Sequence, residues 1–278
     1  MDKKTIHLNT VKGKVLLFGG IYSNLQALKA LIKIAKKENI APENCFCTGD
    51  LIGYCAQPEK TIQTFIQWGA RTIIGNVEQQ LRNGDMDCGC DFTSGSRCDT
   101  FSKAWYPFAQ KELSEDAIKW MLTLPDHISF TYAHKKVTLV HGTYQYISEF
   151  IFKSTPWNSK APSFQETESD VIVAGHCGIP FSHKKNELLW LNPGVIGMPA
   201  NDGQPHVWYV ILDDVNEFSY SFKNLSYNYK KASELMIEKK LPIAYATTLL
   251  TGFWDNMEIL PQEEQLWKGK NLAELINH

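Results

Sequence analysis

Residues 14–28 read KVLLFGGIYSNLQAL, a short apolar run followed by two glycines and the beginning of a helical pattern. The run 14–18 is compact enough to be a buried strand, and Gly19 and Gly20 favour a sharp turn after it. Apolar residues then recur at helical spacing over residues 24–39, which predicts a helix with one apolar face. The stretch therefore predicts a strand, a tight turn and a covering helix.

The same order of strand, turn and helix continues through the first third of the chain. Residues 45–47 predict a short buried strand that ends at Gly49-Asp50, and residues 58–68 predict an amphipathic helix with proline at its first position. Residues 71–74 predict a third strand, which ends at Gly75-Asn76. Alternating strands and helices favour a largely parallel sheet with crossover connections on its faces.

The rest of the chain favours a second set of strands. We expect an acidic, cysteine-containing loop over residues 84–99 and a helix over 114–124. Strands are predicted at 128–132, 137–140, 171–174, 188–191 and 207–212. The C-terminal part favours polar helices with a stop at Gly252. The predicted fold class is α/β, a two-sheet β-sandwich flanked by helices with a C-terminal helical extension.

Composition favours one domain over residues 1–278, with a core at about 14–222 and a C-terminal helical segment at 223–278. Of the 278 residues, 44% are hydrophobic, which is enough for one large core. A formal net charge of −2 gives no basis for binding nucleic acid or an anionic membrane. The first apolar run, at 15–18, is too short for a secretory signal or a membrane span, so we expect a cytoplasmic protein. Homo-oligomer formation is left open.

Four predicted strands end in a small or apolar residue followed by a side chain that can bind a metal. These side chains are Asp50, Asn76, His141 and His176. The carboxyl ends of strands gather at one edge of an α/β sheet, where ligands bind. Two oxygens and two imidazole nitrogens suit a divalent metal such as zinc, manganese or iron. Although Asp and Asn also cap turns and helices, four such strand ends together favour a metal site.

Six segments carry motifs that are specific when taken together. They are FGGIYSNLQAL at 18–28, GDLIGYCAQP at 49–58, GNVE at 75–78, HG at 141–142, GHCGIPF at 175–181 and NPGVIG at 192–197. In order and spacing they resemble the calcineurin-like metallophosphoesterase superfamily, in particular its bacterial phosphodiesterase and phosphatase branch. The resemblance runs from residue 14 to about residue 200, and the C-terminal tail is similar to the C-terminal helices of many bacterial members. It implies the calcineurin-like phosphoesterase fold.

The departures from the family pattern fall on one half of the expected site. Members usually bind two metals, and the resemblance implies first-metal ligands at the positions that here hold Gly20, Tyr22 and Gly178. The His that usually assists the leaving group is replaced by Val77. The second-metal set, Asp50 with Asn76, His141 and His176, is complete. The resemblance therefore implies one divalent metal.

Several residues near these positions could rebuild part of the missing chemistry. Tyr22 offers a phenol and Glu78 a carboxylate, and both are candidate catalytic residues. Asn24 matches a family residue that holds the opening loop in place. Cys55 could line the pocket, and Cys177 either faces the site or is an inert buried thiol. The tryptophans, Trp105 and Trp254 among them, are expected to pack in the core or at subunit contacts.

The seven cysteines are an odd number without a secretory signal, so reduced thiols are expected. Cys88, Cys90 and Cys98 lie in the predicted 84–99 loop. They could bind a soft metal or form a redox pair, but three thiols lack the fourth ligand of a structural zinc site. The other interpretation is an ordered lid with free thiols.

These observations lead to two hypotheses about function. The first is a metallophosphoesterase-like hydrolase that acts on a phosphate ester through a single-metal or rebuilt site. The alternative is a non-catalytic family member that binds a metal, a small phosphorylated ligand or a partner protein. Loss of the two-metal arrangement favours the alternative, whereas the complete second-metal set favours the enzyme. In either case the expected ligand is a small phosphorylated molecule.

Overall fold

The computed structural model describes residues 3–90, 93–272 and 276. One of its two sheets has five strands in the order β11-β10-β2-β3-β4. Their bounds are β2 (Val15–Phe18), β3 (Cys45–Cys47), β4 (Arg71–Thr72), β10 (Val207–Asp213) and β11 (Ser219–Leu225). The pairs β2–β3 and β3–β4 are parallel, whereas β10 runs antiparallel to β2 and β11. The parallel part brings the carboxyl ends of β2, β3 and β4 to one edge.

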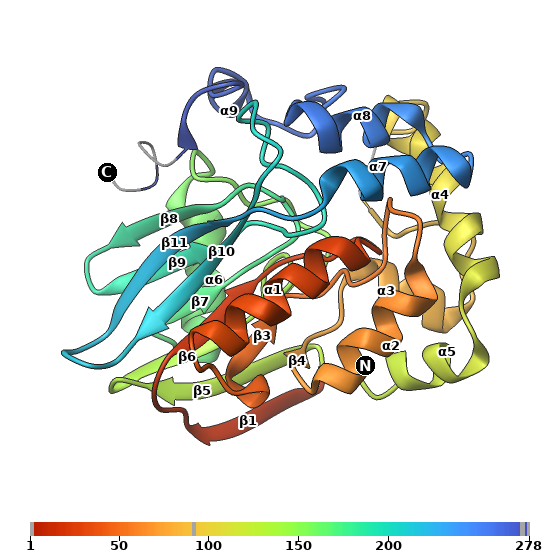
Figure 1. Cartoon of the computed structure of the whole chain (residues 1–278). Helices are drawn as coiled ribbons and strands as arrows, with labels where there is room; N and C mark the ends of the chain where they lie inside the picture. The colour runs from red at the N-terminus through yellow and green to blue at the C-terminus, as the bar shows by residue number, and fades with distance from the viewer. Residues whose placement is uncertain (1–2, 91–92, 273–275, 277–278) are drawn as a thin grey trace.

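The second sheet has six strands in the order β1-β5-β6-β7-β9-β8. Their bounds are β1 (Thr5–Thr10), β5 (His127–Tyr132), β6 (Lys135–Leu139), β7 (Val171–Val173), β8 (Phe181–Lys185) and β9 (Leu188–Asn192). The strands β6, β7 and β9 are mutually parallel, so their carboxyl ends also lie at one edge. The two sheets pack face to face (Figure 1).

Alternating side chains of the buried strands supply two different hydrophobic layers. Leu17 packs between the sheets with Phe46 and Phe130, whose rings stack with centroids 4.9 Å apart. Leu16 and Phe18 point to the opposite face and pack against the helices. A strand that is covered on both faces needs a continuous apolar run, which explains the sequence of β2.

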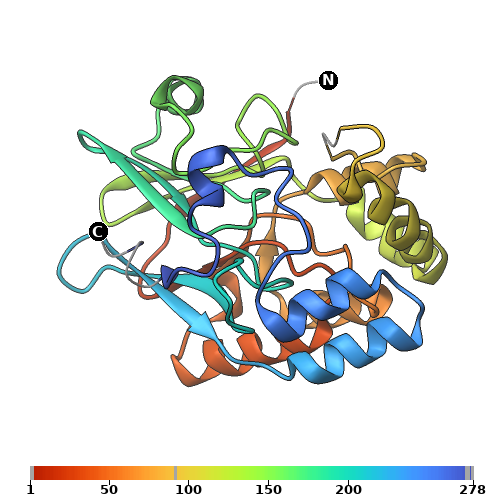
Figure 2. The ribbon, with the colours of Figure 1, turned by 90° about the horizontal axis from the view of Figure 1, so that it is seen from above.

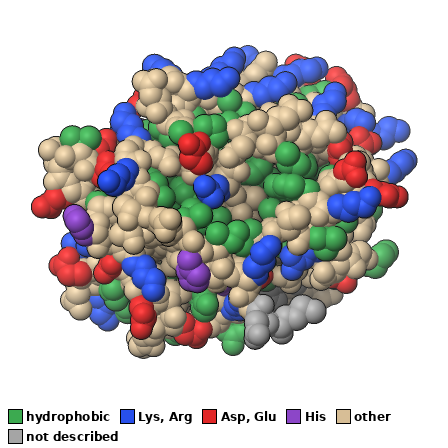
Figure 3. Space-filling view, turned by 90° about the horizontal axis from the view of Figure 1, so that it is seen from below, with side chains coloured by type: hydrophobic (Ala, Val, Ile, Leu, Met, Phe, Trp, Pro, Cys, Tyr) green, Lys and Arg blue, Asp and Glu red, His purple; other side chains and the backbone are tan. Residues whose placement is uncertain are grey.

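The helices cover the outer faces of both sheets. Their bounds are α1 (Leu25–Lys37), η1 (Pro42–Asn44), α2 (Pro58–Trp68), α3 (Asn76–Asn83), α4 (Arg97–Glu112), α5 (Glu115–Met121), α6 (Trp157–Thr167), α7 (Tyr229–Glu238), α8 (Ile243–Thr251) and α9 (Gln262–Gln265). The helices α1, α2 and α7 pack on the five-stranded sheet, and α6 packs on the six-stranded sheet. Seen from above, α7 lies beside both α8 and α1 (Figure 2). On the opposite face, hydrophobic side chains gather near the middle and charged side chains surround them (Figure 3).

The prediction of two sheets flanked by helices is confirmed, but several elements were not predicted. The edge strand β1 was not predicted because its sequence, TIHLNT, is mostly polar, and most of its residues are exposed. The helix α4 has proline in its interior and begins at Arg97, so the predicted loop over 84–99 was too long. The strand predicted at 71–74 is only Arg71–Thr72, because the chain then turns toward Gly75. The helices α3 and α6 and the strands β8 and β11 were also absent from the prediction.

The predicted division into a core at about 14–222 and a helical segment at 223–278 remains a proposal. The strand β1 precedes this core, and β11 crosses the boundary by three residues, 223–225. No helix in the described part of the chain combines the length and hydropathy that a membrane span needs.

Candidate functional site

The structure brings the four predicted metal ligands together at the carboxyl ends of the strands. His141 Nε2 lies 2.9 Å from Asn76 Oδ1, 3.1 Å from His176 Nδ1 and 3.3 Å from Asp50 Oδ2. One ligand atom each from Asp50, His141 and His176 lies within 4.8 Å of the others. All four side chains are buried.

Hydrogen bonding determines which nitrogen of His141 faces this cluster. The carbonyl of Thr48 lies 2.6 Å from His141 Nδ1, so this nitrogen carries the proton and donates it. In the neutral ring, Nε2 then has a lone pair that points at the oxygens of Asp50 and Asn76. Several lone pairs that converge on one point repel one another unless a cation lies between them. The donor set therefore fits a divalent metal.

The amide of Asn76 is oriented by the following loop. Its Nδ2 donates to the carbonyl of Cys88 at 2.8 Å and to Cys90 Sγ at 3.1 Å. Because the nitrogen is held on that side, the oxygen faces His141. The loop thus positions a metal ligand, a contribution that the sequence did not reveal.

Two of the four ligands have strained backbones. Asp50 and His176 have φ of +57° and +61°, in the left-handed region that non-glycine residues seldom occupy. Such strain persists only where the surrounding structure enforces it, and it concentrates at functional sites. The turn before Asn76 requires glycine, since a Cβ on Gly75 would lie 2.2 Å from Asp50 Oδ1.

Glu78 occupies a different place from the one expected of a catalytic carboxylate. Its Oε2 accepts the backbone N–H groups of Asp50 and Gly75 at 2.9 and 3.0 Å, and its Oε1 accepts that of Ile52 at 3.0 Å. Burial, followed by the charge of Asp50, raises the pKa of Glu78 to about 7. With both oxygens occupied by the backbone, Glu78 is a positioning residue that fixes the Asp50 turn.

The charges at the centre are mutually dependent. Burial alone would raise the pKa of Asp50, but the neighbouring imidazoles of His141 and His176 outweigh it and lower the pKa. For His141 the balance is reversed: burial opposes the charged form, yet Asp50 raises the pKa. Burial and the nearby His141 lower the pKa of His176 to about 3, so its imidazole is neutral. The cluster therefore combines one carboxylate with imidazoles suited to a cation.

Tyr22 fills the side of the site where the family resemblance implies a first metal. A Cβ placed on Gly20 would lie only 2.4 Å from Tyr22 Cε1, and one on Gly53 would lie 2.9 Å from Tyr22 Cδ1. A Cβ on Gly197 would lie 2.6 Å from that of Tyr22. Gly20 and Gly53 thus leave room for the ring, and Gly197 leaves room for the backbone and Cβ that carry it. Tyr22 is 6% exposed. Burial raises the pKa of Tyr22 well above its usual range, so the phenol stays protonated.

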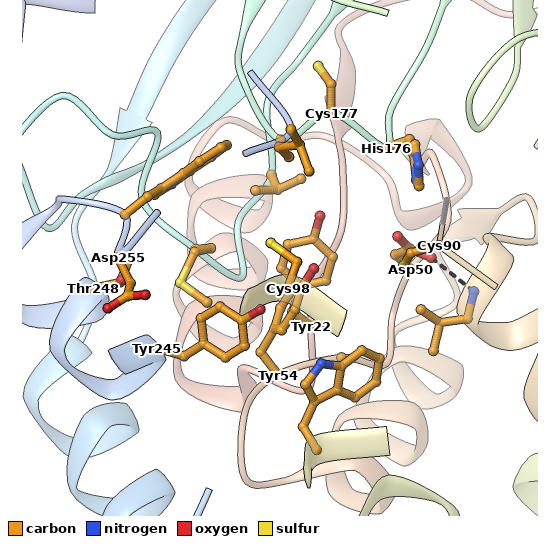
Figure 4. A pocket seen from close by; sticks show the side chains of 18 of the residues that line it. Tyr22, Asp50, Tyr54, Cys90, Cys98, His176, Cys177, Tyr245, Thr248 and Asp255 are labelled. Atoms are coloured by element: carbon orange, nitrogen blue, oxygen red, sulfur yellow. Dashed lines mark hydrogen bonds between the residues drawn. The ribbon is translucent and has the colours of Figure 1, made fainter. Parts of the chain in front are cut away.

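Asn24 supports the loop that carries Tyr22. Its Oδ1 caps α1 by accepting the N–H of Ala27 at 3.1 Å, and its Nδ2 donates to the carbonyl of Gly197 at 3.1 Å. Cys55 is buried, and its Sγ lies 3.8 Å from the carbonyl oxygen of Gly197. Cys55 does not line the cavity that is described below. Cys177 borders the cavity, but its sulfur accepts the amide of Asn192 at 3.2 Å and points away from the tyrosines (Figure 4).

The three loop thiols do not form a metal site of their own among the described residues. Cys88 and Cys90 lie beside Asn76, whereas Cys98 is on α4, 3.5 Å from Asn256 Oδ1. In the described part of the chain, the group of Asp50, His141 and His176 is the one cluster of His, Cys, Asp or Glu that could hold an ion. All seven cysteines are free.

A cavity opens directly beside the metal ligands, and aromatic side chains form much of its wall. It contains about 800 Å³ of empty space, part of it open to solvent, and Asp50 and His176 border it. We call it the aromatic chamber and define it by Tyr22, Tyr54, Trp105, Phe150, Tyr245 and Trp254. These residues come from distant segments, so no local pattern revealed the chamber. Trp105 and Trp254, expected to be core or contact residues, line it.

Comparisons with known proteins agree with the fold and show the family. The family model of the calcineurin-like phosphoesterase superfamily domain matches residues 14–216. The uncharacterized protein MJ0912 of Methanocaldococcus jannaschii is 26% identical over 262 residues, which cover 87% of this chain and 99% of that protein.

Two solved structures share the fold. The hypothetical protein PH1004 from Pyrococcus horikoshii has a TM-score of 0.72 at 18% identity, covering 87% of this chain and 99% of its own. A metallophosphoesterase from Sphaerobacter thermophilus has a TM-score of 0.68 at 19% identity, covering 87% of this chain and 100% of its own.

Proposed function

Because the chain belongs to the calcineurin-like phosphoesterase superfamily, we propose that it hydrolyses a phosphate ester at a centre with one divalent metal. The ligands are Asp50, Asn76, His141 and His176, and the ion is zinc, manganese or iron. The observation that carries the proposal is the convergence of Asp50, Asn76 and His176 on the lone pair of His141 Nε2.

The residues of the chain have separate tasks in this proposal. When bound, a divalent ion supplies charge stabilisation for a phosphoryl group and makes a water molecule more acidic. Thr48 and Glu78 hold His141 and Asp50 in place through the backbone. Tyr22 borders the same cavity as Asp50, and its protonated phenol is the candidate hydrogen-bond donor to the ester.

One observation favours the alternative of a non-catalytic, ligand-binding protein. Val77 borders the cavity at the position of the usual leaving-group acid, and it supplies no proton. Glu78, beside it, faces the backbone and not the cavity. A protein that binds a phosphorylated ligand without turnover would have the same ligand set and the same lack of an acid.

The deciding experiment measures metal content and turnover on the same preparations. Wild-type protein is analysed for bound metal and assayed with 4-nitrophenyl phosphate in the presence of manganese, zinc or iron. Asp50→Ala should abolish both binding and turnover, because a methyl group supplies neither charge nor lone pair. The matched control is Asp202→Ala, which removes a buried Asp that pairs with His206 at 3.4 Å outside the cavity.

Each outcome separates the two functions. Metal binding with turnover that Asp50→Ala removes supports the hydrolase. Metal binding without turnover in the wild type supports the non-catalytic alternative. Activity that persists in Asp50→Ala refutes the proposed site.

A further inference from the structure

We propose that the aromatic chamber binds the organic group of the ester, and that this group is an uncharged aromatic ring system carrying a hydrogen-bond acceptor. This inference rests on the proposed function in one respect, because that function is what makes the ligand a phosphate ester. The chamber itself is an independent structural feature, and its binding properties can be measured without catalysis.

The position of the chamber assigns it to the organic group. Asp50 and His176 lie at one end of the cavity, and Tyr54 and Tyr245 lie beyond them toward Asp255 (Figure 4). A phosphate held at the metal ligands would therefore place its ester group next to the tyrosines.

The walls select for aromatic surface. Tyr54 makes edge-on contacts with Tyr22, Tyr245 and Trp105, with ring centroids 4.8, 4.5 and 5.2 Å apart. Rings that meet edge to face also offer edges and faces to a further ring. The same wall also contains three uncharged residues, Gly53, Gly178 and Val195.

The chamber also disfavours a charged group. None of the described residues that line it is Lys or Arg, and Asp255 at its far end is paired with Arg97. Cations occur in a separate groove, which His141 borders and which contains Lys3, Lys4 and Arg82. An anion buried among the tyrosines would lose its hydration without gaining a cation to pair with, whereas an uncharged ring has no charge to desolvate.

Unused donors in the wall explain the need for an acceptor on the ligand. Trp105 is 1% exposed, and its indole Nε1 has no hydrogen-bond partner. The phenols of Tyr22, Tyr54 and Tyr245 make no hydrogen bond to another described residue. Leaving a buried donor unpaired is costly, so a ligand that brings an acceptor to Trp105 gains specificity.

The first test measures binding without metal or turnover. Full-length protein treated with chelator is titrated with 4-methylumbelliferone, a flat ring system with a carbonyl acceptor, and fluorescence anisotropy is recorded. We expect saturable binding that Trp105→Phe weakens about tenfold, because this change keeps a ring and removes only the N–H. The matched control is Trp190→Phe, since Trp190 is also buried with an unpartnered Nε1 but does not line the chamber.

The second test measures specificity in turnover. The ratio of kcat/KM for 4-methylumbelliferyl phosphate to that for glycerol 2-phosphate is compared among wild type, Trp105→Phe and Trp190→Phe, so that intrinsic reactivity cancels. The ratio should fall about tenfold in Trp105→Phe and stay unchanged in Trp190→Phe.

The outcomes distinguish the two proposals. Absence of saturable binding, or equal effects of Trp105→Phe and Trp190→Phe, overturns the chamber inference even where phosphate esters are hydrolysed. Binding that depends on Trp105, in a protein that turns over neither ester with any of the three metals, supports the chamber and refutes the hydrolase.

Discussion

The substitution Gly20→Ala tests whether Tyr22 has taken the place of the missing ligand at residue 20. The added Cβ would lie 2.4, 2.7 and 3.0 Å from three atoms of the Tyr22 ring, well inside van der Waals contact. Overpacking of this kind costs about 1–3 kcal/mol. We therefore expect Gly20→Ala to lower the free energy of unfolding by that amount in urea denaturation.

The same substitution should have the opposite sign when the ring is absent. Gly20 has no left-handed φ, so alanine fits its backbone. A compatible Gly→Ala change stabilises by about 0.4–1 kcal/mol through the unfolded chain. In the Tyr22→Ala background, Gly20→Ala should therefore be neutral or stabilising, which gives a difference of roughly 1–4 kcal/mol between the two backgrounds.

A neighbouring glycine provides the control. A Cβ on Gly19 would also approach an atom to 2.4 Å, but this atom is the carbonyl oxygen of Gly194. Gly19→Ala should therefore cost the same with and without the Tyr22 ring. If Gly20→Ala behaves like Gly19→Ala, with costs equal within about 0.5 kcal/mol in both backgrounds, the reasoning about Tyr22 is refuted.

Three further predictions concern buried polar groups. Glu78→Gln places an amide NH₂ against a backbone N–H, so this variant should be less stable by about 1–3 kcal/mol. It should also bind the metal more weakly in calorimetric titration. An unchanged metal affinity would contradict the positioning role of Glu78. Burial lowers the pKa of His127 from 6.5 to about 4, so the unfolded state takes up its proton first, and about 2 kcal/mol of stability should be lost between pH 7.5 and 5. His127→Gln should remove this part of the pH dependence in denaturation curves, and an identical loss in the variant would exclude His127 as its source. Lys160→Met, which deprives the carbonyls of Phe152 and Thr155 of their donor, should lower the thermal midpoint by several degrees; a rise would show that burying the amine costs more than its bonds return.

The proximity of the four predicted metal ligands could be predicted from the sequence because each one follows a strand. Parallel strands place their carboxyl ends together, so Asp50 and Asn76 had to lie near each other once β3 and β4 paired. The same holds for His141 and His176 after β6 and β7. In these cases, local pattern and sheet geometry determine the position.

Other features depend on contacts that no local pattern encodes. The chamber gathers Tyr54, Trp105 and Tyr245 from a loop and two separate helices, and their approach is decided only by tertiary packing. The role of Glu78 had a usable signal, because Gly75 and Glu78 occupy the N-cap and N3 positions of α3, where a Glu side chain bonds back to the cap. The polar edge strand β1 gave no signal, since an exposed edge needs no apolar alternation.

Tyr22 belongs both to the positions where the family resemblance implies first-metal ligands and to the aromatic chamber. A glycine at residue 20 would by itself leave a gap, yet the Tyr22 ring occupies this space and Gly53 leaves room for it. The same ring packs on Tyr54 and forms part of the chamber wall. An aspartate restored at residue 20 would therefore collide with a packed ring, so a second metal requires removal of Tyr22 as well as return of the ligands. We therefore expect the chamber and a two-metal centre to compete for one volume, which the Tyr22 ring fills in this structure.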